Sequence, residues 1–331
     1  MTNAIEHAIG VVIIGRNEGA RLVRCLASVT GFAGRVIYVD SGSTDGSVAE
    51  AAAAGAEVVV LDMSRPFTAA RARNAGLAAL GVHEGLGTAS DDAPEYIQFI
   101  DGDCEMDANW LEQGLNFLDS RHDVAVVSGR LRERHPDASI YNALCDEEWD
   151  APVGETHYCG GIALMRKRAL TQTGLFDSRM IAGEEPELCL RLQDDGWKIW
   201  RLPDEMALHD AAMMRFDQFW ARMRRGGFAY ALWTDMHGRG RNGLGARMML
   251  RSLFWGAVLP ISVLLAAVIV SPWAFALLLI YPLHMLQLVR RGHRPGTAML
   301  LVVGKFAEAK GVVDFYLSKW RGKPVGLIEH K

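Results

Sequence analysis

Short apolar runs alternate with helical patterns in the N-terminal part of the chain, and this alternation constrains the fold more than any other feature. The runs cover residues 10–15, 35–39, 57–61, 96–100 and 124–127. Strands that alternate with helices form a mainly parallel sheet, because each parallel connection needs a crossover. We therefore predict an α/β fold in which a mainly parallel central sheet is flanked by helices.

The fourth apolar run leads directly into Asp101, Gly102 and Asp103. Open α/β sheets bind ligands at the carboxyl ends of their strands. Mg²⁺ or Mn²⁺ takes one or two carboxylates there and leaves its other positions to water and substrate phosphates. The same three residues also form ordinary turns, so the motif alone leaves that alternative open. With the motifs described below, we predict that Asp103 is a metal ligand whose side chain faces solvent.

Charge and cysteine content exclude several classes of protein. The chain has 35 Lys and Arg against 39 Asp and Glu, so it lacks the overall positive field that attracts nucleic acid. Its five cysteines are scattered without a CxxC pair, which predicts a reducing compartment and argues against a disulfide framework or a structural zinc site. The N-terminus has no charged-then-apolar leader, so we expect no cleaved signal peptide.

Two apolar segments, 253–270 and 273–289, follow one another near the C-terminus. Each approaches the length that a helix needs to span a bilayer. Arginines lie on both outer flanks: Arg247, Arg251, Arg290, Arg291 and Arg294. By the positive-inside rule, this pattern predicts a membrane hairpin with both flanks in the cytoplasm. The alternative is a pair of buried helices in a soluble domain or an oligomer interface, which Pro260 and Pro282 keep open.

An aromatic and basic segment precedes these apolar segments. Phe216, Phe219, Trp220 and Met223 are interspersed with arginines. This composition predicts a helix in the membrane interface, with rings at the acyl boundary and guanidinium groups among phosphates. The alternative is a core-packed helix with a solvated basic face.

Seven short motifs carry a resemblance to a known family. In chain order they cover residues 11–18, 38–46, 72–76, 101–103, 159–161 and 183–191, followed by His209. Together they resemble the family 2 glycosyltransferases with the GT-A fold, over about residues 9 to 210. The turn after the first strand reads Gly-Arg-Asn-Glu-Gly-Ala, so it is not the G-x-G-x-x-G of a dinucleotide site, and no P-loop sequence occurs.

The resemblance implies a nucleotide-sugar donor, UDP- or GDP-linked. The residues implied in donor binding are Asn17, Glu18, Asp40, Ser43, Arg73, Asn74 and Asp101. Asp40 matches the family residue that contacts the base. Arg73 and Asn74 are expected either to reach the diphosphate or to hold the loop that does, and a plain surface role is the alternative for both.

The resemblance also implies the catalytic groups. Asp103, with His209, would hold Mg²⁺ or Mn²⁺ against the leaving diphosphate. Glu185 matches the family's general base and Glu184 is its neighbour, although Glu-Glu-Pro stands here where Glu-Asp is commoner. A solvated acidic helix start is the alternative for the two glutamates, and a core or surface role is the alternative for the histidine.

The acceptor side of the site is expected around Gly160 and Gly161, because two glycines permit close approach of a sugar ring. A simple tight turn is the alternative. Trp149 lies upstream and is a candidate lining residue.

These inferences predict four regions. A GT-A catalytic domain covers residues 1–210, with donor binding in about 1–105 and the acceptor side in about 106–210. An interfacial helix region covers 211–245, a membrane hairpin 246–294, and an amphipathic tail 295–331. The C-terminal segment resembles the tails of bacterial exopolysaccharide-type members, through Lys305, Glu308, Lys310, Tyr316 and the closing residues 327–331.

The predicted function is an inverting glycosyltransferase of bacterial polysaccharide or glycolipid biosynthesis. It would sit at the inner membrane with its catalytic domain in the cytoplasm, contact membrane lipid, and use a lipid-linked or glycan acceptor. Self-association is compatible with the sequence. A processive synthase is disfavoured because Q-x-x-R-W is missing: Gln218 is followed by Phe-Trp-Ala-Arg-Met. A non-catalytic scaffold is disfavoured because Asp103 and Glu185 are both intact.

Overall fold

A computed structural model describes residues 9–31, 34–85, 90, 92–238 and 243–322. The final segment 327–331, which we compared with exopolysaccharide-type tails, lies outside these residues. The chain forms two compact units, and each is described here by itself. The first unit comprises Met1–Arg134 and Glu148–Ala211, and the second comprises His135–Glu147 and Ala212–Lys331. The second unit therefore includes a short segment from the middle of the chain, His135–Glu147, as well as the C-terminal part.

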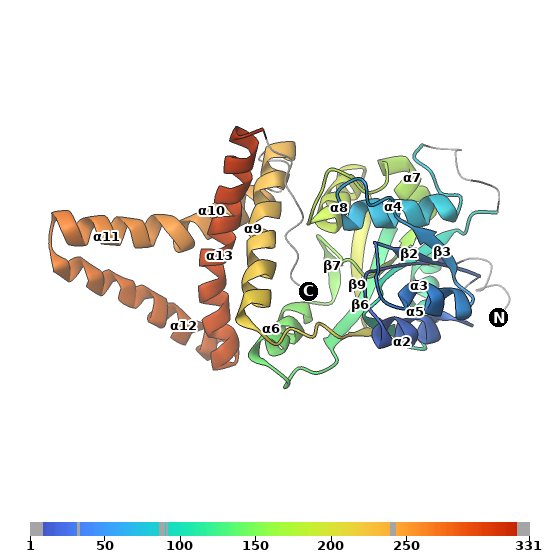
Figure 1. The fold of residues 1–331 in the computed structure, drawn as a ribbon, viewed down its shortest axis with the longest axis horizontal. Coiled ribbons are helices and arrows are strands. Elements are labelled where there is room, and N and C mark those ends of the chain that lie inside the picture. The colour runs from blue at the N-terminus through green and yellow to red at the C-terminus, as the bar shows by residue number, and fades with distance from the viewer. Residues whose placement is uncertain (1–8, 32–33, 86–89, 91, 239–242, 323–331) are drawn as a thin grey trace. The chain divides into compact units, whose positions relative to one another are not determined.

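A nine-stranded mixed sheet forms the centre of the first unit (Figure 1). Its strands are β1 (Ile9–Gly15), β2 (Arg35–Asp40), β3 (Glu57–Val60), β4 (Tyr96–Asp101), β5 (Cys104–Met106), β6 (Val124–Glu133), β7 (Gly154–Thr156), β8 (Ala163–Arg166) and β9 (Lys198–His209). The order is β3-β2-β1-β4-β8-β6-β9-β5, with β7 on β9. Pairing is parallel from β3 to β4, as predicted. Beyond β4 the sheet is mixed, because β8 runs antiparallel to both of its neighbours.

Helices cover both faces of this sheet. They are α2 (Ala20–Val29), α3 (Ser47–Ala53), α4 (Ala69–Ala79), α5 (Trp110–Ser120), α7 (Lys167–Thr173) and α8 (Glu184–Asp194), while α6 (Ile140–Trp149) leads out of the second unit. Alternate residues of β1 divide between two cores. Val11 packs with Leu22 of α2 on one face, and Val12 packs with Leu77 of α4 on the other. This division follows from the two-residue period of a strand, which sends successive side chains to opposite faces.

The second unit is helical. Its elements are α9 (Phe216–His237), α10 (Leu244–Leu253), the π-helical turn η1 (Phe254–Val258), α11 (Leu259–Ile269), the 3₁₀ segment η2 (Pro272–Leu279), α12 (Ile280–Arg290) and α13 (Pro295–Trp320). Glycines let α9 and α13 approach closely. A Cβ at Gly227 would lie 1.9 Å from the carbonyl oxygen of Glu308, and one at Gly311 would lie 1.9 Å from that of Arg224. Both contacts are sterically impossible for any other residue, so the two backbones touch.

The predicted apolar segments form two long helical stretches joined at Ser271, which caps the second by accepting from the Trp273 N–H. The first stretch, Leu244–Ile269, is unbroken, and its Pro260 lies at the start of α11, directly after the π-helical turn η1. Proline lacks the N–H that an α-helix needs, and a wider turn accommodates this loss. Pro282 falls in the first turn of α12, where the 3₁₀ segment η2 passes into an α-helix. Neither proline therefore interrupts the hairpin.

The interfacial prediction for α9 needs a correction. The ring of Phe219 is fully buried and stacks on Tyr141, with 5.7 Å between ring centroids, so it belongs to the core of the helical unit. Phe216 remains exposed and Trp220 partly exposed at the same end of the helix. Sequence alone did not separate these rings, because the partner of Phe219 comes from the distant segment 135–147.

Candidate active site

The site lies around the carboxyl ends of β4, which ends at Asp101, and β9, which ends at His209. Strand β4 ends at Asp101, and β5 begins only three residues later. Nevertheless β5 does not pair with β4; it pairs with β9, at the other end of the strand order. In that pairing Cys104 is the register partner of His209. Asp103 immediately precedes β5, and its carbonyl accepts a 3.0 Å hydrogen bond from the Asp210 N–H. Strand pairing therefore brings two residues that are distant in sequence to one point.

Asp103 and His209 form the pair predicted to hold a metal. The Asp103 Oδ1 and His209 Nε2 atoms lie 3.4 Å apart. Two neighbouring ligands of an octahedral Mg²⁺ or Mn²⁺ lie about 3 Å apart, so the pair suits one edge of such a site. The Cys104 thiol, 3.7 Å from Asp103 Oδ1, completes a group of three ligand-type side chains. One expectation is wrong: the side chain of Asp103 does not face solvent, since the residue is only 3% exposed.

The loops after β1 and β2 hold one another. The Asn17 N–H donates to Ser43 Oγ at 2.9 Å, and Asn17 Oδ1 accepts from the Thr44 N–H at 2.7 Å. Asn17 adopts a φ of 55°, a left-handed conformation that asparagine tolerates better than most residues. Glu18, the next residue, is buried and pairs with Arg21 at 2.7 Å. The two loops thus form one rigid edge next to the sheet.

Asp40 organises the second of these loops. Its carboxylate accepts from the N–H groups of Gly42 and Ser43, each at 3.0 Å, and from the Tyr38 hydroxyl at 3.2 Å. Burial raises the pKa of the Tyr38 hydroxyl well above its usual range, so this group stays protonated and donates. The residue that we expected to contact the base is therefore also the residue that shapes the turn.

Arg73 in α4 joins three parts of the site. It is 4% exposed, and its guanidinium donates to Glu184, to Asp101 at 3.2 Å and to the carbonyl of Gly161 at 3.4 Å. Burial works against its charge, but the carboxylates of Glu184 and Asp101 raise its pKa overall, so it remains charged. Arg73 therefore joins the end of β4, the first turn of α8 and the backbone at Gly161.

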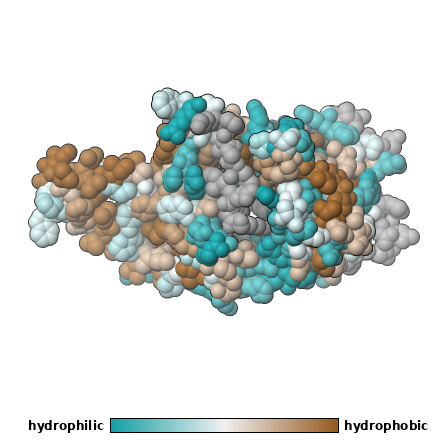
Figure 2. Space-filling model, in the orientation of Figure 1, coloured by the Kyte–Doolittle hydropathy of each residue, from teal (hydrophilic) through white to brown (hydrophobic). Residues whose placement is uncertain are grey.

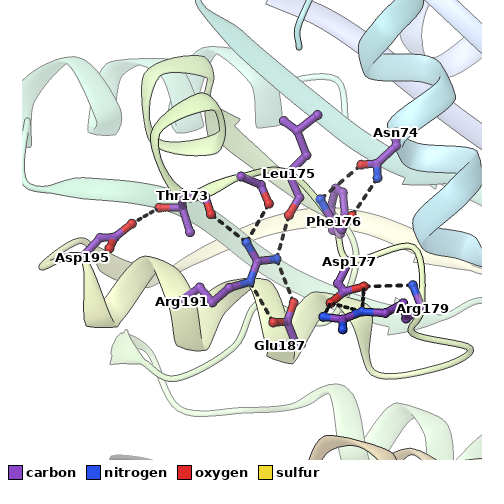
Figure 3. Close-up of polar contacts among 10 residues, drawn as sticks. Asn74, Thr173, Leu175, Phe176, Asp177, Arg179, Glu187, Arg191 and Asp195 are labelled. Atoms are coloured by element: carbon purple, nitrogen blue, oxygen red, sulfur yellow. Dashed lines mark hydrogen bonds and ion pairs between the residues drawn. The ribbon is translucent and has the colours of Figure 1, made fainter. Parts of the chain in front are cut away.

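Asn74 has a similar holding role (Figure 3). Its side-chain amide accepts from the Phe176 N–H at 3.1 Å and donates to the Phe176 carbonyl at 2.7 Å. The ring of Phe176 in turn lies under Arg73, with the guanidinium carbon 5.6 Å from the ring centroid. Asn74 therefore fixes the segment between α7 and α8 rather than pointing to the strand ends.

Arg191 and Glu187 form a network that was not predicted from the sequence (Figure 3). The Arg191 guanidinium pairs with both Glu187 oxygens, at 2.7 and 2.8 Å, and donates to the carbonyls of Thr173, Gly174 and Leu175. These bonds tie the end of α7 to α8. The spacing of four residues between a glutamate and an arginine was the available signal, and the network fixes the helix that carries the candidate base.

Glu184 and Glu185 stand at the first turn of α8 but point to different partners. Glu184 pairs with Arg73. Glu185 is 5% exposed, and its Oε1 accepts from the Cys159 N–H at 2.5 Å and from the Cys189 thiol at 3.1 Å. Burial raises the pKa of the Cys189 thiol, so the thiol is protonated and donates. Both recorded bonds to Glu185 therefore go to one oxygen of its carboxylate.

The expected acceptor-side residues divide between two places. Gly160 and Gly161 follow Cys159 with φ angles of 85° and 88°, which only glycine adopts readily, and the Gly161 carbonyl meets Arg73. The ring of Trp149 packs edge-on against the imidazole of His209, with 4.6 Å between centroids. Trp149 thus lies against the candidate metal ligand, and the two glycines lie by the candidate base.

Glu133 is a buried carboxylate near His209 that was not predicted from the sequence. Glu133 ends β6, and its register partner across the parallel β6–β9 pair is His209. A strand-end carboxylate was visible in the sequence, but nothing local showed that β6 would lie beside β9.

Two family models match the chain. The model described as glycosyl transferase family 2 matches residues 10–174, and the model described as glycosyl transferase family group 2 matches residues 96–289. The chain belongs to the family 2 glycosyltransferases. The resemblance drawn from the seven motifs is therefore confirmed.

Relatives of this family 2 glycosyltransferase include a pre-mycofactocin glycosyltransferase of Mycobacterium tuberculosis, 31% identical over 61% of this chain. The aligned part spans only 42% of that longer protein. The glycosyltransferase AglE of Haloferax volcanii is 24% identical over 64% of this chain and 69% of its own length.

Solved structures support the predicted GT-A fold. The mannosyltransferase PcManGT of Pyrobaculum calidifontis, solved with GDP-Man and Mn²⁺, superposes with a TM-score of 0.63, 17% identity, and coverage of 92% of this chain and 87% of its own. TarS of S. aureus gives a TM-score of 0.50 at 13% identity, over 75% of this chain and 43% of its own. At these identities the likeness concerns the fold.

Proposed function

We propose that this family 2 glycosyltransferase transfers a sugar from a nucleotide-sugar donor to a lipid-linked acceptor, with inversion and with the help of a divalent metal. The observation that carries the proposal is the Asp103–His209 pair, which lies at the carboxyl edge of the sheet with ligand atoms 3.4 Å apart. The loops held by Asn17 and Asp40 would bind the nucleotide at the same edge.

Asp103 and His209 would hold the metal. When bound, the metal would neutralise the charge of the departing diphosphate. Mg²⁺ prefers oxygen ligands, whereas an imidazole nitrogen favours a transition metal, so we propose Mn²⁺ as the preferred ion. The Mn²⁺ found with the mannosyltransferase of similar fold supports this choice.

Glu185 is the proposed general base. Its Oε1 is held by the Cys159 N–H and the Cys189 thiol, which leaves Oε2 to accept the proton of the acceptor hydroxyl. The Cys159 bond also places the carboxylate beside Gly160 and Gly161, the predicted acceptor side. Glu184 instead balances the charge of the buried Arg73. In a single inverting displacement, the hydroxyl oxygen bonds to the sugar carbon as the diphosphate leaves from the opposite face.

The helical hairpin supports a place at the membrane. Two stretches of the described chain, Leu244–Ile269 and Pro272–Arg290, are long and apolar enough to cross a bilayer, and only 17% and 6% of their most apolar windows are buried. Figure 2 shows apolar side chains gathered over the outer end of this hairpin, where Val268, Ile269 and Val270 are exposed. A hairpin buried in a soluble core would hide these groups. We therefore propose insertion from the cytoplasmic face of the inner membrane, next to a lipid-linked acceptor of polysaccharide or glycolipid assembly.

Donor binding should depend on Asp103 and on Mn²⁺. In detergent, one member of a UDP- and GDP-sugar panel should raise the melting temperature of the full chain when Mn²⁺ is present, because a ligand of the folded state stabilises it. EDTA and Asp103→Asn should both remove the shift, and Mg²⁺ should give a smaller one. Asp107→Asn, whose carboxylate only caps a local turn through the Asn109 N–H, is the matched control. An undiminished shift in EDTA and in Asp103→Asn would refute the metal role.

The two glutamates should respond differently to amide substitution. Glu185→Gln can still accept the Cys159 N–H but cannot take a proton, so turnover should fall about 10²-fold or more with donor affinity nearly unchanged. Glu184→Gln removes a charge opposite the buried Arg73, so it should mainly lower the melting temperature. Steady-state kinetics and thermal melts of both variants check this. A large turnover loss in Glu184→Gln alone would move the base assignment to Glu184.

The hairpin predicts a definite topology. Cytoplasmic reporters fused after residue 331 and before residue 1 should both be active, and the chain should remain with membranes after a carbonate wash. Replacing Leu264 and Leu265, which are exposed and lie away from the hairpin connection, by Asp should release it, since charges in a bilayer core cost several kcal/mol in total. The same change at the exposed Val60 of the catalytic unit is the control. A soluble oligomer that needs no detergent would instead assign the apolar surface to a protein interface.

A further inference from the structure

Glu133 is a buried carboxylate that the mechanism above does not use. The residue is 3% exposed at the end of β6. Its Oε2 accepts a 3.1 Å hydrogen bond from the Ala211 N–H and lies 3.9 Å from Nδ1 of His209. Burying a carboxylate is costly unless nearby donors or positive charge compensate it, and the Ala211 N–H and the imidazole of His209 are two such groups beside Glu133.

The sheet explains how Glu133 reaches His209. β9 lies between β5 and β6, and its residue His209 is in register with Cys104 on one side and with Glu133 on the other. The imidazole consequently has Nε2 toward Asp103 and Nδ1 toward Glu133, at 3.4 and 3.9 Å. The edge of the Trp149 ring packs against the imidazole. Each ring nitrogen of His209 therefore faces a carboxylate: Nε2 faces Asp103 and Nδ1 faces Glu133.

Further bonds fix the same strand end from outside. The Ala211 N–H anchors the Glu133 carboxylate, and the His209 carbonyl accepts from the Arg134 N–H at 2.8 Å. Arg24 of α2 pairs with Asp210 at 3.2 Å. The backbone on both sides of His209 is thereby held, so the remaining freedom of the imidazole is its ring orientation and the location of its proton.

We propose that Glu133 is a positioning residue for the metal ligand His209. A metal on the Asp103 side takes the lone pair of Nε2, so the imidazole proton must then lie on Nδ1. The Glu133 carboxylate, 3.9 Å from Nδ1, favours that N–H and so opposes the pull of Asp103 on a proton at Nε2. Histidines that bind metals commonly give their other ring N–H to a carboxylate, and loss of that partner typically weakens metal binding 10- to 100-fold. The inference rests on the proposed metal role of Asp103 and His209.

The tautomer can be read without metal or turnover. In ¹⁵N-labelled, metal-free Asp103→Asn protein, which lacks the competing carboxylate at Nε2, long-range ¹H–¹⁵N spectra at a pH above the histidine titration should show His209 protonated at Nδ1. Adding Glu133→Gln should shift the population toward the Nε2–H form or a mixture. A His209 protonated at Nε2 in Asp103→Asn would overturn the proposal even if the double variant failed to fold.

Metal affinity is the second readout. Electron paramagnetic resonance of free Mn²⁺, titrated with full-length protein and UDP or GDP, should give a dissociation constant 10- to 100-fold weaker in Glu133→Gln. Glu105→Gln is the matched control, because Glu105 is a neighbouring carboxylate on β5 that pairs with Arg134 at the rim. Its affinity should stay within about threefold, since a partly exposed charge acts weakly through solvent.

The outcomes separate this inference from the proposed function. Failure of the wild-type chain to bind Mn²⁺ with either nucleotide would refute the metal role itself. Normal wild-type binding with an equal affinity in Glu133→Gln would refute only the positioning role. Equal losses in Glu133→Gln and Glu105→Gln would show a general effect of charge and would also overturn it.

Discussion

The pairing of β5 with β9 is the interaction on which the site depends. This short antiparallel contact places Cys104 opposite His209 and so brings Asp103 to the end of β9. Without it, the aspartate after β4 would lie at an ordinary turn, and the histidine would lie at a strand end with no ligand partner. The parallel β6–β9 pair adds Glu133 from the other side. Three strands that are far apart in the sequence, β5, β6 and β9, therefore bring Asp103, Glu133 and His209 together.

Local sequence predicted the parts of the fold that local physics determines. Strand and helix alternation predicted the parallel half of the sheet, and the carboxylates after the strands indicated the edge where ligands bind. The strand order of the mixed half could not be predicted in the same way, because the neighbours of a strand depend on pairing between distant segments. For the same reason Glu133 was missed and the burial of Asp103 was not expected. The bonds of Arg73 to Glu184 and of Asn74 to Phe176 join segments distant in sequence, so they could not be predicted without the fold.

In the helical unit, too, local features were predicted from the sequence and contacts between distant segments were not. Two apolar segments with flanking arginines predicted a hairpin, and the structure has two long helical stretches there. The close approach of α9 and α13 through Gly227 and Gly311 was not predicted, because a glycine in a helix does not reveal which backbone it faces. That packing buries Phe219 and leaves Phe216 exposed, so only part of the aromatic segment is available to a lipid surface.

Whether His209 binds the metal is the question that decides most directly between a metal site and an ordinary polar cluster. Electron spin echo envelope modulation of Mn²⁺ bound to the full chain with UDP or GDP detects nitrogen coordinated to the ion. We expect one directly bound ¹⁴N in the wild-type protein and its loss in His209→Gln. A bound Mn²⁺ without nitrogen coupling, or coupling that persists in His209→Gln, would contradict the site as described.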